Sequence, residues 1–131
     1  MEDRDLNIIS GKILDSSIEV HRNLGPVLLE SVYQYCLCKE FDLRNINYEK
    51  QILVPIHYKG ELVTSDLRID MLVEKEIIIE LKSVHTMHPV YTAQLLTYLK
   101  LLKKRLGILI NFNVHVLVDG YKRIVNKYEK L

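Results

Sequence analysis

Apolar residues recur every three to four positions over the first forty residues, which is the spacing of amphipathic helices. The first stripe ends at Leu24, and Gly25-Pro26 follows it as a helix stop. The second stripe predicts a helix from about Leu28 to Arg44. The stripes consist of Leu6, Ile9, Ile13, Ser17, Val20 and Leu24, and of Leu29, Val32, Tyr33, Cys36 and Phe41. The chain is therefore expected to begin with two helices.

The pattern then changes to the alternation of half-buried strands. Apolar and aromatic side chains at alternate or near-alternate positions predict one strand over 48–58, and Lys59-Gly60 turns it. The next segment, DLRIDMLVEKEIIIELKSV over 66–84, predicts two strands around a charged turn. The middle of the chain is therefore expected to form strands of a sheet.

The last third predicts one more helix and a final set of strands. His88-Pro89 starts a helix over 90–104, because proline is tolerated in the first helical turn. A buried strand follows over 106–112, and a closing hairpin turns at Asp119-Gly120. The order α-α-β-β-β-α-β plus a small C-terminal hairpin predicts one α/β domain over 1–131, with a central mixed β-sheet flanked by helices.

Composition limits the class of protein. The chain has 131 residues, of which 48% are hydrophobic, enough for one compact core. It holds no run of eighteen uncharged apolar residues, and its N-terminus MEDRDLNIIS is acidic and polar, so we expect a cytoplasmic protein with no membrane segment. Cys36 and Cys38 diverge on a helix and suit packing better than a disulfide or a zinc site.

The net charge of +1 hides an uneven distribution. Residues 1–98 hold 10 Lys and Arg against 15 Asp and Glu, whereas residues 99–131 hold eight basic residues against two acidic ones. A basic segment can contact the phosphates of a nucleic acid, but solvated helix faces and chain ends are commonly basic too. The basic candidates for phosphate contacts are Lys100, Lys103, Lys104, Arg105, Lys122, Arg123 and Lys127.

Charges within the 66–84 segment point to chemistry. If Glu74-Lys75-Glu76 forms a three-residue loop, Asp70 falls directly opposite Glu80, and Lys82 shares their face of the sheet. Two like charges in this position cost stability unless they share a cation, and paired carboxylates suit Mg²⁺. A solvated edge hairpin is the alternative, although Leu72 and Ile78 on the same face are apolar.

Five blocks of the sequence together resemble a known family. Asp70 followed by Glu80-Leu81-Lys82 is similar to the D…E-x-K pattern of the PD-(D/E)xK nuclease superfamily, and 94–98, QLLTY, is similar to the Q-x-x-x-Y motif of its RecB-like branch. The blocks IEVHRNLGP over 18–26, LESVY over 29–33 and INFN over 110–113 resemble the small prokaryotic GxxExxY family of that superfamily. The resemblance implies a restriction-endonuclease-like core.

The resemblance also implies roles for individual residues. Asp70, Glu80 and the backbone carbonyl of Leu81 would bind Mg²⁺ or Mn²⁺, Glu30 would complete the metal site, and Lys82 would act on the attacking water. Gln94 and Tyr98 would border the site and touch metal-bound water or a phosphate. The basic segment, on the ground of its charge, and Tyr98 are the predicted contacts to nucleic acid. Two alternatives stay open, because Glu30 also favours a helix N-terminus and the Gln94–Tyr98 pair also suits a packed helix edge.

One position departs from the family pattern. Val27 stands where the GxxExxY motif begins with glycine, and a β-branched residue avoids positive φ. We therefore expect the chain to enter the second helix differently, with Gly25 taking over the turn.

The function predicted from the sequence is metal-dependent hydrolysis of phosphodiester bonds, in DNA. The alternative is a catalytically weak or inactive module of the same fold that binds nucleic acid or a protein partner. A third possibility, a structure-selective resolvase, requires a homodimer.

Overall fold

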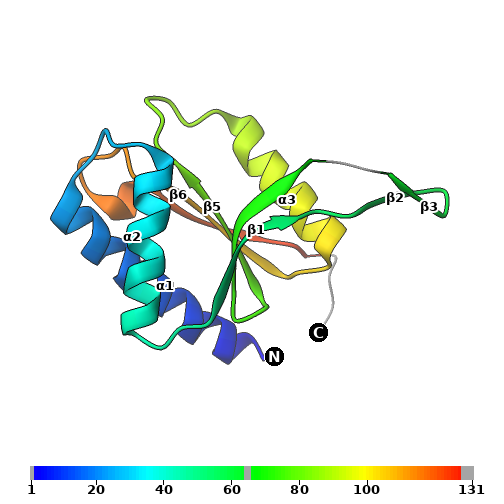
Figure 1. Cartoon of the computed structure of the whole chain (residues 1–131), viewed down its shortest axis with the longest axis horizontal. Helices are drawn as coiled ribbons and strands as arrows, with labels where there is room; N and C mark the ends of the chain where they lie inside the picture. The colour runs from blue at the N-terminus through cyan, green and yellow to red at the C-terminus, as the bar shows by residue number, and fades with distance from the viewer. Residues whose placement is uncertain (1, 64–65, 128–131) are drawn as a thin grey trace.

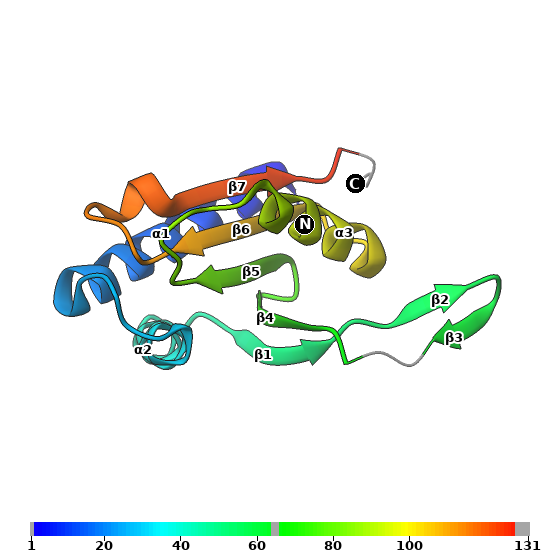
Figure 2. The same cartoon turned by 90° about the horizontal axis from the view of Figure 1, so that it is seen from above.

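The structure, a computed structural model, describes residues 2–63 and 66–127 of the chain. Three α-helices and a five-stranded sheet form its body, and a two-stranded hairpin projects from it (Figures 1 and 2). The helices are α1 (Asp3–Leu24), α2 (Glu30–Leu43) and α3 (Pro89–Leu102). The strands are β1 (Tyr48–Leu53), β2 (Ile56–Tyr58), β3 (Glu61–Val63), β4 (Arg68–Val73), β5 (Ile77–Lys82), β6 (Leu106–Asn111) and β7 (Tyr121–Val125).

The main sheet is mixed and has the strand order β1-β4-β5-β6-β7. Strands β5 and β6 are parallel and are joined through α3, whereas the other neighbours are antiparallel. Every residue of β6 is buried, as expected for a central strand covered on both faces. The predicted α/β class with a central mixed sheet and flanking helices is confirmed, and the architecture is consistent with a restriction-endonuclease-like core.

The sheet separates two groups of buried side chains. Helices α1 and α2 pack on one group, which includes Tyr33, Phe41 and Ile79. Helix α3 packs on the other through Leu95 and Leu99. Helices therefore cover both faces of the sheet.

The single strand predicted over 48–58 is wrong, because the structure has two strands there. The strand expected over 48–58 breaks after Leu53, because Pro55 has no N–H to donate to a ladder. Its second part pairs with β3, a strand that was not predicted, and forms the projecting hairpin. The turn predicted at Lys59-Gly60 is confirmed, since both residues adopt positive φ, 49° and 84°, as a tight hairpin turn requires.

The predicted C-terminal hairpin at Asp119-Gly120 is also wrong. Residues Leu117–Gly120 form a 3-10 helix, and β7 joins the main sheet beside β6. Glycine is required at position 120 by a close approach of the backbone, because a Cβ there would lie 2.1 Å from the Asn111 carbonyl oxygen. Gly120 is therefore needed for the close contact with the Asn111 backbone, and the Asp119-Gly120 pair does not form a two-residue turn.

The entry to α2 contradicts the expectation for Val27. Val27 adopts φ 70° despite its β-branched side chain, and Gly25 adopts φ 71° as well. The Tyr33 hydroxyl fixes this loop, because it donates to the Gly25 carbonyl at 2.6 Å and accepts from the Leu28 N–H at 3.2 Å. The Tyr33 ring in turn stacks on Phe112 with 4.4 Å between ring centroids. The core thus holds the loop in a conformation that valine alone would avoid.

Within the described ranges, no helix combines the length and the apolar character needed to cross a membrane.

Candidate functional site

The β4–β5 hairpin has the register that the sequence predicted. Val73 pairs with Ile77 across a three-residue loop, in which Glu74 and Lys75 adopt positive φ. The pairing continues to Met71 and Ile79. The next step along the two strands brings Asp70 to Glu80.

At Asp70 and Glu80, side chains replace the regular backbone ladder. The Asp70 N–H donates to Oε1 of Glu80 at 3.4 Å, and the Leu81 N–H donates to Oδ2 of Asp70 at 2.7 Å. Each carboxylate therefore contacts the backbone of the opposite strand, which holds both acids at one point of the sheet.

The pairing of β4 with β1, its other neighbour in the sheet, is interrupted at the same position. Pairing between β1 and β4 runs up to Lys50 and Met71 and resumes at Ile52 and Ile69. Met71 packs in the α1–α2 cluster, but Ile69 packs with α3, although residues two apart in a regular strand share a face. Strand β4 therefore changes face at Asp70.

Burial and the second carboxylate set the protonation of Glu80. The Glu80 side chain is only 7% exposed. Burial, and then the charge and the hydrogen bond of Asp70, raise the pKa of Glu80 to about 9, against a lowering effect of Lys82. Glu80 is therefore protonated at neutral pH in the absence of a cation, and a divalent ion would compete with that proton.

Lys82 lies two residues beyond Glu80 and is half-buried. Its Nζ lies 4.7 Å from the centroid of the Tyr91 ring, a cation–π contact. The first turn of α3 carries this ring, and His88 caps that turn by accepting the Val90 N–H at 3.0 Å. Sequence reasoning missed Tyr91, although it lies three residues before Gln94 and thus on the same helix face.

Tyr98 lies near the acid pair, and Gln94 lies one turn before it on α3. Tyr98 is 5% exposed, and the Gln94 side chain hydrogen-bonds to it from the more exposed side of α3. Burial and then the charge of Glu80 raise the pKa of Tyr98. The structure thus brings Asp70, Glu80, Lys82, Gln94 and Tyr98 to one region.

Glu30 lies apart from this pair. It is the exposed first residue of α2 and shares a hollow of about 540 Å³ with Ser83 and Asn113. Ser83 follows Lys82 and connects the end of β5 to the loop before α2, because its Oγ donates to the Leu28 carbonyl at 2.5 Å. Over 2–63 and 66–127, no three His, Cys, Asp or Glu side chains gather closely enough to hold a metal.

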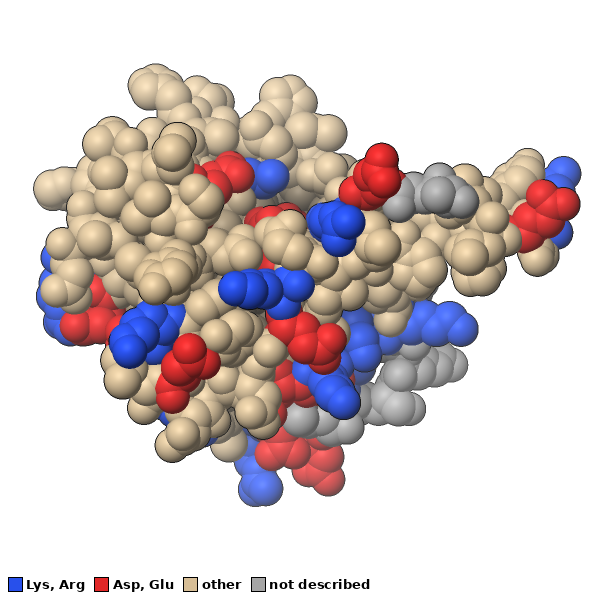
Figure 3. All heavy atoms as spheres, viewed as in Figure 1, with Lys and Arg blue, Asp and Glu red and all other residues tan. Residues whose placement is uncertain are grey.

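Several of the predicted phosphate-binding side chains have partners inside the chain. Arg105 forms an ion pair with Asp3, Lys122 donates to Oγ1 of Thr92 at 3.2 Å, and Arg123 donates to Oδ1 of Asn7 at 2.8 Å. On the face shown in Figure 3, basic and acidic side chains intermingle. The other predicted basic residues are Lys100, Lys103, Lys104 and Lys127, of which Lys103 ends α3 in a left-handed conformation.

Comparison with known proteins decides the family. The model of the PD-(D/E)XK nuclease superfamily matches residues 7–124, which include the acid pair and every strand except the last residue of β7. The chain belongs to the PD-(D/E)XK nuclease superfamily. No curated protein and no solved structure matches the chain.

The acid pair of this PD-(D/E)XK chain fits a divalent cation chemically. PD-(D/E)XK nucleases generally use divalent metals. Asp70 and Glu80 offer carboxylate oxygens, the donors that hard cations take, and both are held by contacts to the backbone of the opposite strand. The protonated Glu80 would have to lose its proton to become a ligand, so a cation bound here would compete with that proton.

Proposed function

We propose that this chain is a metal-dependent nuclease that hydrolyses phosphodiester bonds in DNA. The observation that supports this best is the reciprocal contact of Asp70 and Glu80 at the distorted step of the sheet, next to Lys82 and Tyr98. We also propose that the chain is a member of the GxxExxY family and of the RecB-like branch, on the blocks quoted from its sequence.

In this proposal Asp70 and Glu80 hold Mg²⁺ or Mn²⁺, and the Leu81 carbonyl is a third ligand. The bound ion supplies Lewis-acid chemistry, which neutralises charge on a phosphate and acidifies water. Glu30 adds a carboxylate through water, from the hollow that it shares with Ser83.

The other side chains position the substrate and the proton. Lys82 carries an ammonium group over the Tyr91 ring, where it can stabilise charge on the phosphate or orient the attacking water. Gln94 and Tyr98 hydrogen-bond to each other beside the carboxylates and offer polar groups to a phosphate.

The test is cleavage of fluorescently labelled DNA with and without Mg²⁺ or Mn²⁺. We expect cleavage that requires the metal, is lost in Asp70→Asn and Lys82→Ala, and persists in Glu61→Gln, a matched change of an exposed acid on the β2–β3 hairpin. Cleavage by Asp70→Asn equal to that of the wild type, in protein purified free of contaminating nuclease, would contradict the proposal.

The second candidate is a module of the same fold that binds nucleic acid or a protein partner without turnover. The observation in its favour is the position of Glu30 outside a three-residue metal cluster. Metal-independent binding of DNA by the wild type, with no cleavage under any metal, would favour this candidate. A homodimer, which a resolvase would need, would appear as a doubled mass in sedimentation.

A further inference from the structure

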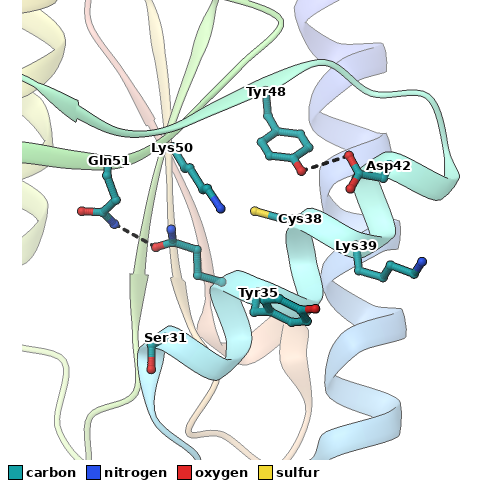
Figure 4. A pocket seen from close by; sticks show the side chains of 9 residues that line it. Ser31, Tyr35, Cys38, Lys39, Asp42, Tyr48, Lys50 and Gln51 are labelled. Carbon is teal, nitrogen blue, oxygen red and sulfur yellow. Dashed lines mark hydrogen bonds between the residues drawn. The ribbon is translucent and has the colours of Figure 1, made fainter.

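A polar hollow of about 380 Å³ lies between α2 and β1, outside the site described above (Figure 4). From β1, Tyr48, Lys50 and Gln51 line it, and α2 contributes Gln34 and Tyr35. Lys50 and Gln51 are adjacent in a strand, where side chains normally point to opposite faces. The local backbone explains how both reach one hollow.

Gln51 adopts φ 54°, a left-handed conformation that a strand residue other than glycine rarely takes. It lies at the step where pairing with β4 is interrupted, opposite Asp70. After Gln51, the side chains of β1 point to the opposite faces from those that a regular strand would give. Tyr48 and Ile52 are four residues apart and should share a face, but Tyr48 packs with the α1–α2 cluster and Ile52 packs with α3. The strained residue thus adds a second polar side chain to the hollow and lies beside the acid pair.

The two bonded amide groups of the hollow each keep one unused hydrogen-bonding atom. Gln51 Nε2 donates to Gln34 Oε1 at 3.0 Å, so the Gln51 oxygen remains an acceptor and the Gln34 nitrogen a donor. Donors and acceptors of this kind can bond to the edge of a nucleobase.

A cation and an aromatic ring complete the hollow. The Lys50 side chain points inward, toward Cys38 (Figure 4). Tyr35 lies at the rim and is 77% exposed, which leaves its ring open for stacking. The acid in the lining, Asp42, accepts the Tyr48 hydroxyl at 2.9 Å, so this carboxylate is already engaged.

The hollow borders a second hollow at the start of α2. Ser31 lines both this hollow and the neighbouring one, which contains Glu30 and Ser83. Ser83 directly follows Lys82 at the end of β5. A strand of nucleic acid that passes Lys82 can therefore enter the hollow between α2 and β1 without leaving the surface.

We infer that the hollow between α2 and β1 binds one nucleotide of a single-stranded segment of nucleic acid, next to the candidate metal site. Tyr35 stacks on the base, the Gln34–Gln51 pair contacts its edge, and Lys50 contacts a phosphate. This inference rests on the proposed function for the identity of the ligand. It also adds a nucleic-acid contact at β1, the edge of the sheet opposite β7, which carries two of the basic residues predicted to contact phosphates.

The test is the anisotropy of a fluorescein-labelled 12-nucleotide single-stranded DNA titrated with the full chain in EDTA, where the candidate metal site takes no part. We expect Tyr35→Ala to weaken binding about tenfold, the size of one lost stacking contact. Lys50→Ala should also weaken binding, and it should lower the salt dependence of binding because one phosphate contact is lost. Tyr58→Ala and Lys59→Ala are matched controls on the projecting hairpin, where Tyr58 is 64% exposed, and should leave binding unchanged.

A further variant separates a binding role from a structural one. Gln51→Gly accepts the left-handed backbone and removes the amide, so it should weaken binding without lowering the Tm. Binding by Tyr35→Ala, Lys50→Ala and Gln51→Gly equal to that of the wild type overturns the inference, and if the wild type still cleaves DNA the proposed function stands alone.

The converse outcomes are equally distinct. If the three variants bind more weakly than the wild type, and the wild type cleaves no DNA with any metal, the inference is supported and the nuclease proposal is wrong. A wild type that binds no single-stranded DNA overturns the inference, and selective retention of a peptide by the hollow would assign it to a protein partner.

Discussion

Replacing Glu80 with glutamine tests the electrostatics of the acid pair through folding alone. The pKa of Glu80 is about 9 in the folded chain and starts from an ordinary value of 4.5. A pKa that folding raises contributes stability that is fully present below the unfolded value and is lost as pH rises through the folded value. The metal-free wild type should therefore become less stable between about pH 4.5 and pH 9 because of Glu80.

The size of this effect follows from the proton linkage. One proton bound by the folded state alone changes the free energy of unfolding by at most about 1.4 kcal/mol per pH unit. Between pH 5 and pH 8 the wild type should lose up to about 4 kcal/mol from this source. Glu80→Gln keeps the shape of the side chain and has no proton to lose, so the variant should lack this loss.

The assay is urea unfolding followed by circular dichroism at several pH values in EDTA. The free energy of unfolding of Glu80→Gln minus that of the wild type should grow steadily with pH. Glu61→Gln, on the exposed hairpin, controls for the loss of an acid as such and should follow the wild type. Parallel curves for the wild type and Glu80→Gln would refute the reasoning that burial and Asp70 keep this proton bound.

Two further predictions concern the loop before α2 and the aromatic ring under the lysine. Val27→Gly should raise the free energy of unfolding by about 1 kcal/mol in urea titrations, because glycine relieves the strain of φ 70° and loses no packing from a side chain that is 78% exposed. Tyr91→Leu should reduce DNA cleavage about tenfold, because it removes the ring under the Lys82 ammonium. The rise in Tm that Mg²⁺ causes should stay unchanged in this variant. An equal loss of cleavage and of the Tm rise would show that Tyr91 only supports the fold.

Local rules were enough for the helices and for the register of the site. The charged loop before Ile77 fixes how β4 meets β5, so the position of Asp70 against Glu80 followed from counting residues. The helix stop at Gly25 and the turn at Lys59-Gly60 likewise follow from backbone preferences of single residues.

The parts that the sequence did not predict depend on tertiary packing. The role of Gly120 comes from the Asn111 carbonyl, a partner nine positions away that no turn rule includes. The positive φ of Val27 persists because Tyr33 holds the loop from the core. The change of face at Gln51 could not be predicted from the alternation of apolar residues, because that pattern assumes a regular strand throughout.

Titration calorimetry of Mg²⁺ into the metal-free chain at pH 7.5 tests the central claim most directly. Run in two buffers with different ionisation enthalpies, it counts the protons that binding releases. If Asp70 and Glu80 hold the ion, the wild type should bind Mg²⁺ and release about one proton from Glu80, and Asp70→Asn should bind no Mg²⁺. Mg²⁺ binding by Asp70→Asn equal to that of the wild type, or binding with no release of protons, would contradict the account.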